Sequence, residues 1–143
     1  MLVSQILKNK GDSVFTVGPN ETIGSASSLL YGRRVGALVV QDEADHVVGI
    51  ISERDVVRAL AEHGGAALAQ PVSRQMSTDV IFAAPTEEVD ALLARMTDRR
   101  IRHLPVCRDG RLVGIVSIGD LVKVKIAEIE HEAETLKNYI AAG

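Results

Sequence analysis

The chain lacks tryptophan, and its two tyrosines and two phenylalanines make up only 3 % of 143 residues. Proteins that bind single-stranded nucleic acid usually stack the bases on aromatic side chains, so such platforms are scarce here. A surplus of basic residues is also missing, since the formal net charge is −3. That charge argues against general binding to nucleic acid phosphates. We therefore expect no nucleic acid partner.

Cysteine occurs once, at Cys107, which excludes a disulfide within the chain. No apolar run reaches the length that crosses a membrane, and the segment from Met1 to Gly11 is too short and too polar for a secretion signal. We expect a cytoplasmic protein without a membrane partner. The content of 46 % hydrophobic and 24 % charged residues indicates a globular protein with an aliphatic core.

Signatures of catalysis are missing as well. The four histidines are scattered singly, without the spacing of a metal site. The sequence contains neither a P-loop nor a Gly-x-Gly-x-x-Gly motif. Cys107 has no histidine or acid placed as in a known catalytic triad signature. The sequence predicts a protein that is not an enzyme and has no metal or catalytic cofactor.

One stretch of the chain occurs twice. Gly-Ile-Ile-Ser-Glu-Arg-Asp-Val at residues 49–56 returns, 65 residues later, as Gly-Ile-Val-Ser-Ile-Gly-Asp-Leu at residues 114–121. Each copy predicts a strand, a serine at the turn, and an aspartate three residues on, where a helix begins. A Ser-x-x-Asp pattern resembles a capping box, which stabilises a helix start by about 1 kcal/mol. The same geometry can bind a ligand, because helix N-termini attract anions and a carboxylate there can accept both hydroxyls of a ribose.

The elements around the two copies repeat in the same order. In the first half we predict helices at 3–9, 23–33 and 52–62, with Asn20 as the N-cap of the second, and strands at 14–17, 35–40 and 47–51. In the second half we predict helices at 72–76, from residue 89 to about 96, and from 118, and strands at 80–83, 104–107 and 112–116. The fold class is α/β (α+β), with each half ordered helix-strand-helix-strand-strand-helix. Neither half is long enough to bury a good core alone, so we expect two halves related by a pseudo-two-fold axis.

The last predicted helix carries a heptad pattern. Its apolar residues are spaced 4, 3, 4, 3 and 4 residues apart, and lysines and glutamates flank them. The apolar positions are Val122, Ile126, Ile129, Ala133, Leu136 and Ile140. A continuous helix from 118 to 140 would be roughly 34 Å long, which exceeds what one small half can cover. We favour packing against another subunit, in a homodimer, over packing along its own domain.

The doubled pattern resembles the tandem CBS domain, a family named after cystathionine β-synthase, whose pairs form Bateman modules. The resemblance covers roughly residues 3–122 and rests on the two Gly-h-h-Ser-x-x-Asp stretches, in which h is apolar, and on their spacing. It places the first CBS repeat at 1–65, the second at 66–122, and a helix extending from the second at 118–143. The short form with a charged last helix is similar to stand-alone bacterial members of the family.

The resemblance implies a regulatory binding module. Such pairs typically bind adenine-containing ligands, namely AMP, ADP, ATP, NAD(H) or S-adenosylmethionine. In the family the matching aspartate holds the ribose hydroxyls, and the matching serine or threonine reaches ribose or phosphate. The ligand would change the shape of the module, and an unidentified regulated protein would read that shape. The implied homodimer forms through the CBS repeats and the C-terminal helix.

Carried over to this sequence, the resemblance predicts two clefts, each shared between the repeats. The first takes Lys10, Ser13, Val14, Phe15, Val35, Gly36, Ala37, Ser117, Gly119 and Asp120. The second takes Ser52, Arg54, Asp55, Thr78, Val80, Ile101, Arg102 and His103. We expect the Asp120 cleft to bind nucleotide better, because Gly119 precedes its aspartate and lets a ligand approach the backbone closely. Arg54 holds that place in the other cleft, where its charge could grip a phosphate or fill the pocket.

Two other functions fit the same residues. The clefts could be empty, so that the protein acts as an interaction or oligomerisation module through its C-terminal helix. An enzyme acting on a nucleotide is the third and weakest interpretation. The sequence does not separate one adenosyl ligand from another, because the ribose and adenine contacts are shared.

Overall fold

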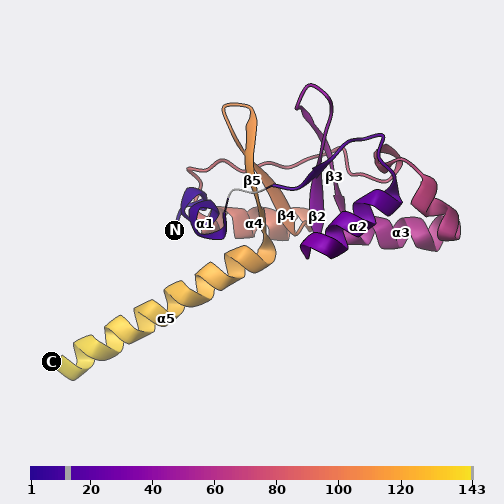
Figure 1. Cartoon of the computed structure of the whole chain (residues 1–143). Coiled ribbons are helices and arrows are strands. Elements are labelled where there is room, and N and C mark those ends of the chain that lie inside the picture. Colours follow the sequence, from indigo (N-terminus) through magenta and orange to yellow (C-terminus); the bar gives the residue numbers. More distant parts are fainter. Residues whose placement is uncertain (12–13, 143) are drawn as a thin grey trace. The chain divides into compact units, whose positions relative to one another are not determined.

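The structure is a computed structural model that describes residues 1–11 and 14–142. Figure 1 shows the order of its helices and strands along the chain. The α-helices are α1 (Val3–Lys10), α2 (Ile23–Arg33), α3 (Glu53–His63), α4 (Val89–Arg99) and α5 (Ile118–Ala142). The strands are β1 (Thr16–Val17), β2 (Ala37–Gln41), β3 (Val47–Ser52), β4 (His103–Arg108) and β5 (Arg111–Ser117). Two 3₁₀ turns, η1 (Gly64–Ala69) and η2 (Val72–Arg74), follow α3.

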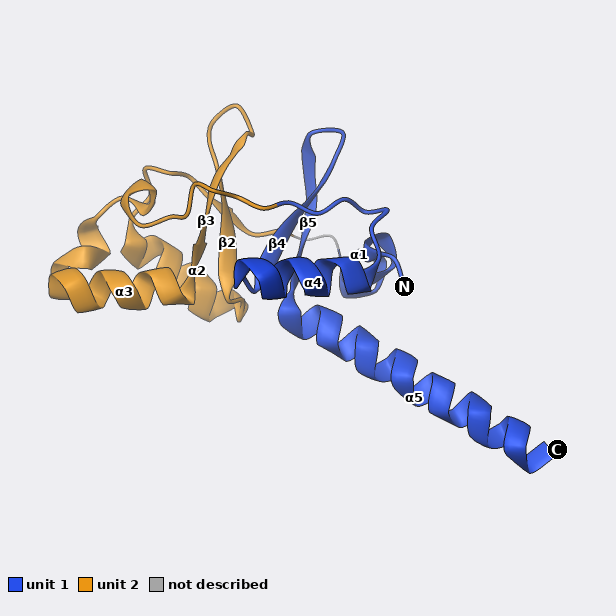
Figure 2. Ribbon diagram, turned by 180° about the vertical axis from the view of Figure 1, so that it is seen from behind, with its two compact units in different colours: residues 1–12, 82–143 blue, residues 13–81 orange. Residues whose placement is uncertain are grey.

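The chain forms two compact units (Figure 2). Unit 1 comprises Met1–Asp12 and Phe82–Gly143, and unit 2 comprises Ser13–Ile81. The predicted repeats divide the sequence between residues 65 and 66, whereas the units divide at residues 12/13 and 81/82. Each unit therefore combines the central elements of one repeat with the short helical segment that begins the other repeat.

Backbone hydrogen bonds hold these exchanged segments in place. In unit 1 the N–H of Val3, in the first turn of α1, donates to the carbonyl of Glu87 at 2.9 Å. In unit 2 the N–H of Val72, at the start of η2, donates to the carbonyl of Glu21 at 2.7 Å. Both bonds attach the exchanged segment to the stretch just before a helix, α4 in unit 1 and α2 in unit 2.

Each unit contains a β-hairpin whose second strand leads directly into a helix. In unit 2, β2 is the central strand, parallel to β1 and antiparallel to β3, with Ala37 opposite Ser52. In unit 1, β4 and β5 form an antiparallel pair, with His103 opposite Ser117. The two serines of the repeated motif thus occupy the same register position in both hairpins.

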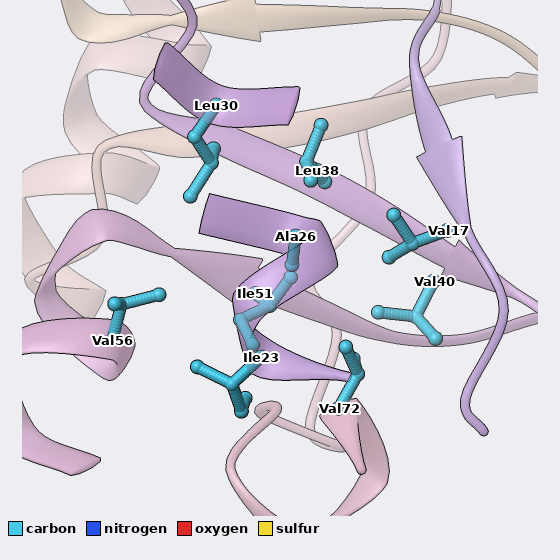
Figure 3. Close-up of a cluster of buried hydrophobic side chains, with 9 residues drawn as sticks. All are labelled: Val17, Ile23, Ala26, Leu30, Leu38, Val40, Ile51, Val56 and Val72. Atoms are coloured by element: carbon cyan, nitrogen blue, oxygen red, sulfur yellow. The ribbon is translucent and has the colours of Figure 1, made fainter. Parts of the chain in front are cut away.

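Aliphatic side chains form the cores, as the scarcity of aromatic residues predicts. Figure 3 shows the cluster in unit 2, which gathers side chains from α2, α3, η2 and the strands β1, β2 and β3. Its members are Val17, Ile23, Ala26, Leu30, Leu38, Val40, Ile51, Val56 and Val72. Most of the buried residues of unit 1 come from α1, α4, α5 and its two strands. They include Val3, Ile6, Leu7, Val89, Leu92, Met96, Leu104, Val106, Val116 and Leu121.

The predicted strand at 80–83 is wrong in extent. Only Ala83 pairs, through a parallel bridge with Val106. The N–H of Ala84 turns away and donates to the side chain of Glu87 at 2.8 Å, and Pro85 has no N–H to offer. The ladder therefore does not continue beyond Ala83. Before Ala83, the carbonyl of Phe82 accepts from Nη1 of Arg95 at 3.0 Å, and the division between the two units falls at residues 81/82, inside the predicted strand.

Three smaller predictions also need correction. The strand predicted at 14–17 is limited to the two residues of β1, and the helix predicted at 72–76 is the single 3₁₀ turn η2. The helix α2 is capped by Thr22, whose side chain accepts from the N–H of Ser25 at 3.1 Å. Asn20, the residue expected to cap it, lies in the preceding turn.

The C-terminal helix α5 is continuous over 25 residues, as the heptad pattern predicts. Leu121 is its one fully buried residue in the range that the structure describes, and every residue from Ile129 to Ala142 is exposed. Figure 2 shows this exposed part extending away from the rest of unit 1. No helix in the described ranges has the length and apolar character needed to cross a membrane.

The glycine of each repeated motif lies where the backbone is closely approached. A Cβ atom on Gly49 would lie 2.6 Å from Sδ of Met76 and 2.9 Å from the backbone oxygen of Ser77. A Cβ atom on Gly114 would lie 2.5 Å from Cδ2 of Leu7. The two glycines thus admit the exchanged segments of the other repeat against the hairpins.

We predict that Gly49→Ala destabilises the protein by about 1–3 kcal/mol, because the backbone of Ser77 has to move to make room. The matched control is Gly32→Ala in α2, where no atom lies within 4 Å of the added methyl group. That change should be neutral or stabilise by up to about 1 kcal/mol. Urea unfolding measures both, and equal effects of the two substitutions would contradict the close approach.

Candidate functional site

Both Ser-x-x-Asp turns form reciprocal hydrogen bonds. In unit 1 the N–H of Ser117 donates to Oδ2 of Asp120 at 2.9 Å, and the N–H of Asp120 donates to Oγ of Ser117 at 3.1 Å. In unit 2 the corresponding distances for Ser52 and Asp55 are 2.8 Å and 3.4 Å. Both pairs are capping boxes, so the structural interpretation of the motif is correct for both copies. The surroundings of the aspartates decide whether either one can also hold a ligand.

In unit 1 a lysine from α1 contacts Asp120. The Nζ of Lys10 donates to Oδ2 of Asp120 at 2.6 Å and to the carbonyl oxygen of Ile115 at 2.9 Å. We call Lys10, Ile115, Ser117 and Asp120 the Asp120 corner. It lies where β5 ends, α5 begins and α1 passes beside them, so it brings together residues more than 100 positions apart in the chain.

The Asp120 corner favours the ionised carboxylate. Partial burial by itself raises the pKa of Asp120, but the hydrogen bonds from Lys10 and Ser117 and the charge of Lys10 outweigh it. The net result is a pKa below the usual value of an aspartate. At neutral pH the corner therefore presents a carboxylate beside an ammonium group.

The equivalent aspartate of unit 2, Asp55, has partners on both of its carboxylate oxygens. Oδ2 of Asp55 accepts from the N–H of Ser52 and from its hydroxyl, the latter at 3.1 Å. Oδ1 lies 3.1 Å from Nη2 of Arg58, which also donates to the carbonyl of Gln75. The side chain of Asp55 is 13 % exposed, compared with 25 % for Asp120.

The two Ser-x-x-Asp turns thus differ in which carboxylate oxygens a ligand can reach. Both carboxylate oxygens of Asp55 already have partners. In the described chain, by contrast, no hydrogen bond or salt bridge involves Oδ1 of Asp120. Asp120 can therefore accept a further donor without first losing a partner.

Arg58 and Gln75 were missed by the sequence analysis. Arg58 stands three residues after Asp55 on α3, and this spacing brings side chains together on a helix. The residue in the same place after Asp120 is Lys123, which lines a groove instead of pairing with the aspartate. The contact with Gln75 joins residues 17 positions apart and has no local pattern that announces it.

A groove in unit 1 runs from the Asp120 corner between α1 and α5. Its volume is about 500 Å³. It is lined by Met1, Ile6, Asn9, Lys10, Asp120, Lys123, Val124, Ala127, Glu128 and His131. At the far end of the groove the terminal ammonium of Met1 donates to Oε1 of Glu128 at 2.9 Å. This groove does not follow from the sequence, because no local pattern shows that α1 packs beside α5.

The remaining predicted site residues fall in both units. Unit 2 contains Val14, Phe15, Val35, Gly36, Ala37, Arg54, Thr78 and Val80. Unit 1 contains Ile101, Arg102, His103 and Gly119. Ser13 lies outside the described residues. Each predicted cleft takes residues from both units, so the structure of a single unit shows one part of each cleft.

Within a unit, the start of the hairpin lies beside the Ser-x-x-Asp turn. The carbonyl of Gly36 accepts from the N–H of Glu53 at 3.0 Å in unit 2. The carbonyl of Arg102 accepts from the N–H of Ile118 at 2.8 Å in unit 1. The small residue Gly36 therefore lies next to the Asp55 turn, and the basic residue Arg102 lies next to the Asp120 turn.

Phe15, which the first cleft includes, is partly buried against the core of unit 2. The guanidinium of Arg33 lies 4.8 Å from the centre of its ring. This is within the range of a cation–π contact. The ring is thus fixed on two sides, by the core and by the arginine.

Residues suited to metal binding or nucleophilic chemistry do not gather in the described parts of the chain. No group of three or more histidine, cysteine, aspartate or glutamate side chains there could hold a metal ion. Burial raises the pKa of the Cys107 thiol, which lowers its thiolate fraction at neutral pH. The observed chemistry of the site is therefore that of a carboxylate, an ammonium group and backbone N–H groups.

Comparison with known proteins finds the CBS domain twice in the chain. The model of that family matches residues 3–62 and residues 72–127. A crystal structure of a CBS-domain containing protein from Agrobacterium tumefaciens is 44 % identical, with a TM-score of 0.84. The match covers 87 % of this chain and 92 % of the Agrobacterium chain. The predicted resemblance to stand-alone bacterial proteins of this type is confirmed.

Two similar structures contain ligands. The CBS domain pair of protein MJ0100, in complex with 5′-methylthioadenosine and S-adenosyl-L-methionine, is 29 % identical over 90 % of this chain and 98 % of its own, with a TM-score of 0.80. A CBS domain protein from Pyrobaculum aerophilum complexed with AMP is 28 % identical over 84 % of this chain and 89 % of its own, with a TM-score of 0.76. All three ligands contain adenosine.

The contact between Lys10 and Asp120 predicts how the ionisation of Asp120 changes when the lysine is removed. In Lys10→Met the pKa of Asp120 should rise, because burial persists while the ammonium group is gone. An NMR titration of the Asp120 carboxyl measures this pKa directly. The matched control is Lys8→Met, which removes a charge from the same helix and should leave the titration of Asp120 unchanged.

The lowered pKa of Asp120 also predicts how the stability of the fold depends on pH. A carboxyl whose pKa is lower in the folded than in the unfolded chain stabilises the fold above its unfolded pKa, and that contribution is lost as the pH falls through the folded pKa. Acid unfolding of Lys10→Met should therefore begin at a higher pH than that of the parent protein. An unchanged Asp120 titration in Lys10→Met would show that the ion pair does not form in solution.

Proposed function

Because the chain belongs to the CBS-domain family, with two copies in tandem, we propose that it is a regulatory module that binds an adenosine-containing ligand and changes shape when it does. The candidates are AMP, ADP, ATP, NAD(H) and S-adenosylmethionine. The observation that carries the proposal is the Asp120 corner, where an ionised carboxylate stands at the start of a helix and one of its oxygens accepts no hydrogen bond from the described residues. CBS-domain structures similar to this chain contain adenosyl ligands.

The proposed ribose site is Asp120. The 2′- and 3′-hydroxyls of a ribose are neighbouring donors, and a carboxylate can accept one on each oxygen. Among the described residues Oδ1 of Asp120 has no partner, and Oδ2 would lose one of its two donors, keeping the N–H of Ser117, if Lys10 moved to another anion. A phosphate or carboxylate of the ligand would be such an anion, so Lys10 would exchange Asp120 for the charged end of the ligand.

Asp55 is the weaker site in this proposal. A ribose would have to compete with Arg58 for Oδ1 and with Ser52 for Oδ2. The carboxylate is also less exposed than that of Asp120. The same asymmetry was expected from the sequence for a different reason, the presence of Gly119 in one motif and Arg54 in the other.

In this proposal, ligand binding changes how often the protein adopts each arrangement of its repeats. A ligand that binds one arrangement of the repeats better than another shifts the protein toward it. In this proposal the ligand joins residues of both units, so its binding favours one relative placement of the units. A homodimer transmits that placement to a regulated protein, and no chemical step on the ligand is involved.

We predict that Asp120→Asn weakens binding of the ligand roughly 10- to 100-fold, because hydrogen bonds to a charged group are lost. The matched control is Asp55→Asn, which changes the same atoms in the other repeat and should weaken binding much less. Isothermal titration calorimetry with AMP and with S-adenosylmethionine measures both variants against the parent protein.

The alternative function makes the opposite prediction. If the clefts are empty and the protein acts only as an interaction module, neither ligand binds the parent protein. Equal loss of affinity in Asp120→Asn and Asp55→Asn would contradict the proposed difference between the two aspartates. Thermal unfolding of each variant without ligand separates a loss of affinity from a loss of the helix cap.

A further inference from the structure

The helix α5 exposes a continuous apolar stripe. Exposure rises along the stripe from 43 % at Val122 to 69 % at Ile140. Its six members are Val122, Ile126, Ile129, Ala133, Leu136 and Ile140, and we call them the α5 seam. Isolated exposed apolar residues are normal on a protein surface, but a seam that follows the 3.5-residue period is the pattern of a coiled coil.

The seam faces away from the helix α1 of its own chain. Val124, Ala127 and His131 line the groove beside α1, and none of the seam residues does so. At about 100° per residue, these groove residues lie on nearly the opposite side of α5 from the seam. The unit to which α5 belongs therefore covers one face of the helix near its start and leaves the seam open.

We propose that the α5 seam is covered by the α5 seam of a second copy of this chain, in a parallel, in-register, two-stranded coiled coil. The heptad places Ile126, Ala133 and Ile140 at position a, and the other three seam residues at position d. Position e is then held by Lys123, Glu130 and Lys137, and position g by Lys125, Glu132 and Tyr139. Residues at e and g flank the seam and set the orientation of the partners.

The flanking charges favour the parallel orientation. In a parallel dimer each g residue lies beside an e residue of the partner, five positions further along the chain. Lys125 then faces the partner's Glu130, and Glu132 faces the partner's Lys137. Symmetry forms each pair twice, so all four charged pairs are attractive.

The antiparallel orientation brings like charges together. With the six seam residues paired from opposite ends, Ile140 lies opposite the partner's Val122, and e residues face e residues while g residues face g residues. Glu130 then meets the partner's Glu130, and Glu132 meets the partner's Glu132. Lys123 and the partner's Lys137 add two further repulsive pairs. The same charges thus disfavour the antiparallel dimer.

One of the charged residues has partners in its own chain. Nζ of Lys125 lies 2.9 Å from Oδ1 of Asp90 in α4 and 3.9 Å from Oε2 of Glu128. Glu132 and Lys137, by contrast, form no salt bridge or hydrogen bond with other residues in the described ranges, and both are exposed. The pair between Glu132 and the partner's Lys137 is therefore the one that best reports the proposed interface.

Disulfide trapping distinguishes the two orientations. The parent is the full chain with Cys107→Ser, and one cysteine is added by Ile140→Cys or, as a control, by Glu134→Cys on the outer face of α5. In the parallel dimer the two cysteines at 140 meet across the seam, within the distance of about 4.4–6.8 Å between Cα atoms that a disulfide needs. In the antiparallel dimer they are about 27 Å apart along the axis. We expect at least tenfold more cross-linked dimer with Ile140→Cys than with Glu134→Cys under mild oxidation.

Charge reversal gives a second, independent test in the Ile140→Cys chain. Adding Lys137→Glu turns two attractive pairs of the parallel dimer into repulsive ones and should weaken dimerisation roughly tenfold. Adding Glu132→Lys as well restores opposite charges and should restore the cross-linked fraction. In an antiparallel dimer Lys137→Glu would face the partner's Lys123 and would strengthen association.

In the cross-linking and charge-reversal tests, any of three results overturns the proposal. These are the absence of a cross-link with Ile140→Cys, equal cross-linking of the two cysteine variants, and stronger association with Lys137→Glu. Sedimentation equilibrium of the parent chain fixes the number of copies, and a trimer or tetramer would also contradict a two-stranded assembly. Circular dichroism confirms that each variant keeps its helical content.

Discussion

The reciprocal bonds between a serine at the end of a hairpin and an aspartate one turn into the next helix determine much of this structure. They fix the point at which β3 becomes α3 and β5 becomes α5, and they hold each carboxylate at the helix start. Three residues earlier, Gly49 and Gly114 let the exchanged segment of the other repeat pack directly on the strand. The capping function and the proposed ligand function therefore use the same atoms.

The repeat is symmetric in sequence order but not in chemistry. The aspartate of unit 2 is neutralised from within its own helix by Arg58, whereas that of unit 1 is neutralised by Lys10 from α1. A partner on the same helix is held in place by the helix, while Lys10 extends from another element and can turn to a second anion. Under the proposed function, this difference makes the Asp55 turn mainly structural and leaves the Asp120 turn to bind the ligand.

Much of the fold was predictable because it depends on local patterns. The repeated motif, the hairpins, the Thr22-to-Arg33 helix region and the heptad of α5 follow from spacing along the chain. The strand expected at 80–83 failed because the division between the two units falls inside it and the side chain of Arg95 bonds the carbonyl of Phe82, neither of which apolar spacing reveals. Arg58, Gln75 and the groove beside α1 were missed since they depend on contacts between distant segments. The resemblance to the CBS family named Lys10 beside Asp120, which no local pattern could do.

The most direct measurement of the central claim is thermal unfolding of the unmodified protein with AMP, ATP, NAD, NADH and S-adenosylmethionine in turn. A ligand present at about 100 times its dissociation constant should stabilise the folded protein by about 2.7 kcal/mol, which raises the melting temperature by several degrees. The account predicts such a rise with at least one of these compounds. The absence of any rise, together with native mass spectrometry that detects no ligand carried through purification, would contradict it.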